Sequence, residues 1–207
     1  MEEISDVKVT KYIPTIYTRP RTVEYIKNGT LRKRSIMAEK NGVVIIIYNK
    51  TRDVLVLVKQ FRPSAYFCQV NEDDFLLDTI DTKKYPPKLG ITLEFCAGLV
   101  DKDLCNEEIA IEEIFEECGY NVEIKDLEEI CTICNLTDTT GAKSFFYYCE
   151  VTDDMKVSNG GGVEGENIEV IDMKVDDVIQ YGTQDYVQSP ACFLFGLNWF
   201  LYNKYRK

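Results

Sequence analysis

Two short runs rich in β-branched residues, VVIIIYN at 43–49 and VLVLVKQF at 54–61, constrain the fold more than any other feature of the sequence. Each run is apolar at nearly every position, which is the pattern of a strand buried on both faces of a sheet. Only the four residues KTRD separate them. We therefore expect two neighbouring central strands.

Other strand and helix signals surround this pair. TVEYIK and LRKRSIM flank Asn28-Gly29, a strong hairpin signal. Further strands are predicted at 92–98, 128–134, 144–151 and 168–173, with an irregular segment at 63–90. One helix is predicted at 106–118, and VDDVIQYG and PACFLFGLNWFLYNKY predict two helices that close the chain. This order predicts an α+β fold with a mixed sheet flanked by helices and a β-rich N-terminal extension.

The helix predicted at 106–118 contains six glutamates and neither lysine nor arginine. Asn106 is its predicted N-cap and Gly119 its C′ residue. Like charges four residues apart destabilise an isolated helix by about 0.2–0.5 kcal/mol per pair. A solvated acidic face explains poorly why no basic residue stands between the glutamates. A bound cation would explain it.

Glu113, Glu116 and Glu117 stand at i, i+3 and i+4 and so share one face of this helix. Clustered carboxylates suit Mg²⁺, or alternatively Mn²⁺, which bind few protein carboxylates and otherwise waters and phosphates. The turn at Ala97-Gly98 could bring a backbone carbonyl to the same metal. The sequence therefore predicts a metal site here.

Composition narrows the choice of partners. The formal charge of −11 argues against binding of nucleic acid or acidic membranes through net charge. No secretory signal and no membrane span are visible, so we expect a cytoplasmic protein. Buried free thiols are expected of the eight cysteines, and Cys131-Thr-Ile-Cys134 is expected to be part of a strand, because the chain has no histidine and no second C-x-x-C pair.

The spacing from Gly98 to Tyr120 resembles the box of the Nudix hydrolases, G-x5-E-x7-R-E-U-x-E-E-x-G-U, where U is a bulky apolar residue. Two positions depart from it: Leu104 replaces the first glutamate and Glu112 the arginine, a pair thought to interact structurally. VLVLVKQFRP and LEFCAGLVD are similar to the nucleoside-diphosphate-sugar branch, and CAGLVD, EECGY and the GGGVEGENIEV loop to animal uridine diphosphate glucose pyrophosphatases. The likeness spans about residues 17 to 202. It implies a Nudix fold at 41–207 preceded by an extension at 1–40.

The resemblance implies metal-dependent hydrolysis of the pyrophosphate bond of a nucleoside diphosphate sugar, UDP-glucose first, giving UMP and glucose 1-phosphate. Two alternatives stay open: an ADP-ribose pyrophosphatase and a catalytically weak nucleotide-binding module. The metal ligands implied are Glu113, Glu117 and the Ala97 carbonyl, with Glu116 as a ligand or as the group that orients a metal-bound water.

The general base is expected on the late glycine-rich loop, at Glu164 with Glu166 as the alternative, and a polar hairpin tip is the competing interpretation. Arg62 is expected to bind the diphosphate, against the alternative of a surface ion pair. Arg32 and Arg34 belong to the only dense basic cluster. The branch is typically dimeric, which implies a homodimer through the N-terminal strands.

Overall fold

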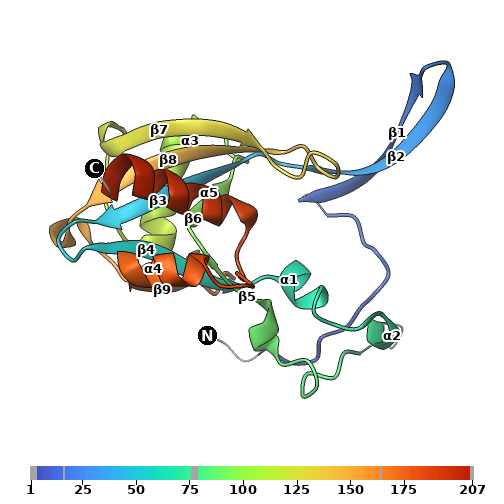
Figure 1. The fold of residues 1–207 in the computed structure, drawn as a ribbon, viewed down its shortest axis with the longest axis horizontal. Helices are drawn as coiled ribbons and strands as arrows, with labels where there is room; N and C mark the ends of the chain where they lie inside the picture. The colour runs from blue at the N-terminus through green and yellow to red at the C-terminus, as the bar shows by residue number, and fades with distance from the viewer. Residues whose placement is uncertain (1–3, 16, 76–78, 164, 206–207) are drawn as a thin grey trace.

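A computed structural model describes residues 4–15, 17–75, 79–163 and 165–205 of the chain. Its main body is a seven-stranded mixed sheet in the order β5-β4-β3-β8-β7, with β6 added beside β3 and β9 beside β4 (Figure 1). The strands of this sheet are β3 (Gly42–Asn49), β4 (Val54–Phe61), β5 (Ile91–Glu94), β6 (Cys96–Leu99), β7 (Leu127–Cys134), β8 (Lys143–Val151) and β9 (Glu169–Lys174).

The two apolar runs form β3 and β4, which confirms their predicted central position. β3 pairs in parallel with β8 and antiparallel with β4 and β6, while β4 also pairs antiparallel with β5 and β9. Successive side chains of a strand point to opposite faces, and both faces of β3 are buried. Val43, Ile45 and Ile47 pack into one core cluster, and Val44 and Ile46 into a second one on the other face.

A helix layer covers each face of the sheet. The acidic helix α3 (Asn106–Glu113), continued by a π-helical turn (Ile114–Cys118), packs into the first core cluster. Helices α4 (Val175–Gly182) and α5 (Ala191–Phe200), the latter continued by a π-helical turn (Leu201–Tyr205), pack into the second. The mixed sheet between two helix layers agrees with the α+β prediction.

The N-terminal hairpin lies outside this sheet. Strands β1 (Thr18–Lys27) and β2 (Thr30–Glu39) pair over their whole length in a sheet of two strands, and they project from the body in Figure 1. Asn28 (φ 52°) and Gly29 (φ 73°) both have positive φ, as a two-residue type I′ turn requires. This turn confirms the predicted hairpin.

Residues ahead of the hairpin return to the body. Val7 and Val9 pack against Tyr66, Val70 and Ile80, next to the short helices α1 (Pro63–Phe67) and α2 (Glu72–Phe75) and the 3₁₀ turn Pro87–Gly90. These short elements occupy the segment that was predicted to be irregular.

Two local predictions were wrong. The single strand expected at 92–98 is divided into β5 and β6 at Phe95, whose buried ring stacks on Phe193 with the centroids 4.9 Å apart. The N-cap of α3 is Cys105 instead of Asn106, because Cys105 has extended φ and ψ and exchanges two hydrogen bonds with Glu108. Asn106 is therefore the first residue inside the helix. Gly119 ends the helix in the left-handed conformation (φ 76°), as predicted.

All eight cysteines are free thiols, but burial was expected of them and does not hold for all: Cys96, Cys118 and Cys149 are buried, whereas Cys68, Cys105 and Cys134 are exposed. Within the described residues, no helix is long and apolar enough to cross a bilayer.

Candidate active site

The C-terminal half of the acidic helix faces strand β6 through Glu117. Its carboxylate is buried, with 4% of the residue exposed, and Oε2 accepts a hydrogen bond from the Ala97 backbone N at 3.0 Å. The residue after Ala97 must be small. A Cβ on Gly98 would lie 2.0 Å from both Cδ and Oε1 of Glu113. The glycine thus allows the second carboxylate to lie directly against the strand.

Burial and mutual repulsion perturb both carboxylates. Burial is the main cause that raises the pKa of Glu117 to about 8; the Glu113 and Glu166 charges add to it, and hydrogen bonds from Ala97 and Cys96 oppose it. Burial likewise raises the pKa of Glu113 to about 7, with further increases from Glu116 and Glu166. Two neighbouring carboxyl groups whose pKa values are both strongly raised are typical of a functional site.

A divalent cation fits this pair, because it would compensate two crowded carboxylates that have no ion-pair partner of their own among the described residues. Across the part of the chain that the structure describes, however, no three metal-ligating side chains converge as a ready-made cation site. Glu113 and Glu117 are thus the two carboxylates that the structure brings together on the strand. Glu116 is half-buried beside them, close enough for its charge to raise the pKa of Glu113. Two carboxylates with the remaining positions filled by backbone, water or phosphate oxygens match the usual coordination of Mg²⁺.

The glycine-rich loop is attached to the end of the same helix. Gly161 N donates to the carbonyl oxygen of Glu117 at 2.8 Å, and Gly162 N donates to that of Glu116 at 3.0 Å. Gly160 has φ +67°, and a Cβ on it would lie 2.1 Å from the Glu117 carbonyl oxygen. Carbonyls at a helix C-terminus lack intrahelical partners, so the loop satisfies them and is held beside the carboxylates.

The structure describes only one of the two candidate bases, Glu164 and Glu166. Glu164 lies outside the described residues. Glu166 is exposed, its Oε2 accepts a hydrogen bond from Val163 N at 3.1 Å, and its charge raises the pKa of both Glu113 and Glu117. Glu166 is thus near the two carboxylates, with one oxygen occupied in closing its own loop.

Arg62, at the end of β4, forms a bidentate ion pair with Glu94 of β5. Its Nε donates to Glu94 Oε1 at 2.9 Å and its Nη2 to Oε2 at 2.7 Å. The Arg62 side chain keeps 43% of its surface exposed, whereas Glu94 is buried. Hydrogen bonding to Glu94 is the main cause that raises the pKa of Arg62, and the charges of Glu94 and then Glu117 add to it. Arg62 therefore lies within electrostatic reach of Glu117.

The two departures from the box, Leu104 and Glu112, form no ion pair or hydrogen bond with each other in the described part of the chain. Leu104 is exposed, while Glu112 pairs with Lys102, whose Nζ lies 2.5 Å from Glu112 Oε2. The view that the acidic helix lacks a basic partner is thus corrected: Lys102, in the loop before the helix, supplies one and also lowers the pKa of Glu113.

Sequence reasoning missed Lys102, Glu94 and Thr92. Thr92 and Glu94 alternate along one strand and so share a face, and the Thr92 hydroxyl donates to Glu94 Oε1 at 2.6 Å. An acidic residue inside an apolar strand was the one available signal, because a buried charge requires a partner. Nothing in the local pattern pointed to Lys102, which lies outside the helix.

Comparison with known proteins shows the family to which the chain belongs. No protein-family model matches the chain. The chain is 34% identical over 211 aligned positions to uridine diphosphate glucose pyrophosphatase NUDT14 of Bos taurus, with 97% of this chain and 95% of that protein covered. The NUDT14 of Mus musculus is 33% identical with the same coverage, and the GDP-mannose pyrophosphatase of Salmonella arizonae is 34% identical over 153 positions, 71% of this chain and 68% of that protein. The resemblance found in the sequence is confirmed: the chain belongs to the Nudix family of nucleotide-sugar pyrophosphatases.

Proposed function

We propose that this protein hydrolyses the pyrophosphate bond of a nucleoside diphosphate sugar, with UDP-glucose as the substrate and UMP and glucose 1-phosphate as the products. The observation that carries the proposal is the buried pair of Glu113 and Glu117 against the strand end at Ala97-Gly98. The choice of UDP-glucose rests on similarity over nearly the whole chain to proteins named uridine diphosphate glucose pyrophosphatase.

Mg²⁺, or Mn²⁺ in its place, would be held by Glu113, Glu117 and the Ala97 carbonyl, with Glu116 as a further ligand or as the residue that orients a bound water. When bound, it would neutralise phosphoryl charge and lower the pKa of the attacking water. The role of the helix is to present these carboxylates in a partly dehydrated place, where charges interact more strongly than in water.

Arg62 would bind the diphosphate, since a guanidinium matches phosphate oxygens bidentately. Its position near Glu117 supports this role. Glu164 would take the proton of the attacking water, with Glu166 as the alternative. The attachment of residues 160–162 to the helix end supports a base on this loop, because it holds the loop beside the carboxylates.

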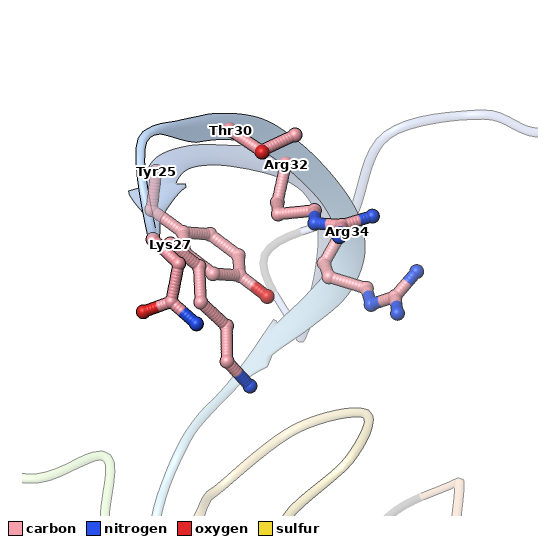
Figure 2. Close-up of a pocket in the computed structure, with 6 residues that line it drawn as sticks. Tyr25, Lys27, Thr30, Arg32 and Arg34 are labelled. Carbon is pink, nitrogen blue, oxygen red and sulfur yellow. The ribbon is translucent and has the colours of Figure 1, made fainter.

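A homodimer through the N-terminal strands is part of the proposal. Tyr25, Lys27, Arg32 and Arg34 line one concave face of the hairpin around a cavity of about 360 Å³, as Figure 2 shows. On the hairpin, Ile26 and Leu31 are cross-strand partners, and both are exposed. A two-stranded hairpin with exposed apolar side chains is marginally stable alone, so a second copy is the expected partner.

A cytoplasmic location is also part of the proposal, and the eight free thiols are compatible with a reducing compartment. Light scattering of the wild type and of Ile26→Glu tests the dimer. A wild type that is already monomeric would contradict it.

The activity is tested by chromatographic detection of nucleoside monophosphate released from UDP-glucose, GDP-mannose and ADP-ribose at equal concentration with Mg²⁺. We expect the highest kcat/KM for UDP-glucose and loss of turnover by orders of magnitude in Glu117→Gln. Glu150→Gln, which alters a surface pair with Lys50, is the matched control. A fully active Glu117→Gln variant would rule out the proposed role of the carboxylate pair. A higher kcat/KM for ADP-ribose than for UDP-glucose would mean that ADP-ribose is the substrate.

A further inference from the structure

The buried carboxylate of Glu94 is fully engaged in holding Arg62. Both of its oxygens accept from the guanidinium, and the Thr92 hydroxyl and the Gln60 amide donate to Oε1 and Oε2 at 2.6 and 3.5 Å. Only 4% of Glu94 is exposed. A planar fork bound at two points has little freedom to rotate, so Glu94 sets the plane in which the guanidinium lies.

The backbone of Arg62 is fixed as well. Its N donates to the Gly90 carbonyl at 2.8 Å, and its own carbonyl accepts from Tyr66 N at 3.0 Å. Gly90 allows this approach, because a Cβ there would lie 2.5 Å from the Phe61 ring and 2.6 Å from Tyr66 Cβ. Both ends of Arg62 are therefore held before any ligand arrives.

One edge of the Arg62 guanidinium is not bonded to Glu94. Nε and Nη2 point to Glu94, and among the described residues no acceptor is bonded to Nη1. The side chain is 43% exposed, so this edge is accessible, and Glu117 is the next carboxylate whose charge acts on it. The donors of Nη1 thus have no acceptor within the described part of the chain and are available to an anionic ligand such as a diphosphate.

We propose that Glu94 is a positioning residue that fixes Arg62 with its free edge toward the substrate diphosphate. The inference rests on the proposed function for the identity of the ligand. The pre-set orientation would improve binding, because the ligand does not have to order a flexible side chain. A neutral replacement of Glu94 would release the guanidinium and leave the half-buried Arg62 cation without its charged partner.

The test combines kinetics and binding in a double-mutant cycle of Glu94→Gln and Arg62→Ala. Glu94→Gln should raise the KM for UDP-glucose, and the Kd of its non-hydrolysable methylene-bridged analogue, by about tenfold, the size expected for a charge-assisted hydrogen bond. kcat should change less. In the Arg62→Ala background, Glu94→Gln should have almost no further effect on Kd, because there is no guanidinium left to position.

Two further variants separate positioning from folding. Glu94→Asp keeps the charge and should recover part of the binding lost in Glu94→Gln, and Thr92→Val, which removes the hydroxyl from Oε1, should weaken binding less than Glu94→Gln does. Additive effects of Glu94→Gln and Arg62→Ala, or an unchanged Kd in a folded Glu94→Gln, would overturn the inference. The Kd measurement does not need turnover, so it remains decisive if the wild type releases no UMP, the result that would refute the proposed function itself.

Discussion

The substitution Glu117→Gln offers a quantitative test, because it removes a buried ionisable group while keeping its shape. The pKa of Glu117 is about 8 against an ordinary value of 4.5. Between these two pH values the folded protein binds one more proton at this site than the unfolded chain, so stability decreases as pH rises. Stability from this group is complete below pH 4.5 and is lost as pH rises through about 8.

The magnitude of this stability change follows from the linkage between proton binding and folding. Within that pH window, each pH unit changes the free energy of unfolding by about 1.36 kcal/mol. Between pH 5.5 and pH 9 the metal-free wild type should lose up to about 3 kcal/mol from this group, to order of magnitude, whereas glutamine loses none. The amide keeps an acceptor for Ala97 N, but a buried NH₂ without a partner costs about 1–3 kcal/mol at every pH. The change in relative stability with pH is therefore the quantity to measure.

The assay is thermal unfolding of both proteins in chelator from pH 5.5 to 9. For a chain of this length, 1 kcal/mol corresponds to about 2–4 °C in Tm. The Tm of Glu117→Gln minus that of the wild type should thus rise by roughly 6–12 °C across the range. Glu112→Gln, on the same helix but half-exposed and paired with Lys102, is the matched control and should show no such rise. Parallel Tm curves for wild type and Glu117→Gln would refute the reasoning.

Millimolar Mg²⁺ should raise the wild-type Tm relative to chelator, because a cation that binds only the folded state stabilises it. The rise should be largest above about pH 8, where the carboxylates are ionised. No shift in Tm at any Mg²⁺ concentration, with or without nucleotide, would mean that the helix presents only a solvated acidic face. Glu112→Arg alone should lower Tm and kcat/KM, because it replaces an ion pair with Lys102 by two like charges. Adding Leu104→Glu should recover both with positive coupling in a double-mutant cycle, and strict additivity would mean that positions 104 and 112 do not interact. Gly160→Ala should lower Tm and kcat through a contact of 2.1 Å with a helix carbonyl oxygen, and Gly141→Ala, with the same φ of +67° and no atom within 4 Å, measures the backbone strain alone; equal losses in the two would show that the contact is unimportant.

Local patterns predicted what local physics determines. The β-branched runs gave central strands, Asn28-Gly29 gave the hairpin turn, and the spacing of Glu113 and Glu117 placed two carboxylates on one helix face. Features that depend on distant residues were not predictable in this way. Arg62 and Glu94 are 32 residues apart and meet only because β4 and β5 pair in one particular register.

The exchange of caps at α3 has the same origin on a smaller scale. Asparagine is the better N-cap by intrinsic preference, but Cys105 is the residue that adopts the extended conformation and completes the reciprocal bonds with Glu108. The break at Phe95 was hidden because the sequence on both sides is equally suited to a strand. At the break, the Phe95 ring stacks on Phe193, almost a hundred residues later, a contact that no local pattern indicates.

The late loop consists of two parts with different freedom to change. Gly161 and Gly162 donate to the final carbonyls of the carboxylate-bearing helix, and Gly160 lies too close to one of them for a side chain, so the length and glycine content of this part are tied to that helix. Beyond them, Gly165 has open space around it. A Cβ at position 165 would therefore meet no neighbouring atom, whereas one at position 160 would lie 2.1 Å from the Glu117 carbonyl oxygen and displace the helix end. One short segment of chain thus joins a part that is fixed to the carboxylate-bearing helix to a part that has room to change.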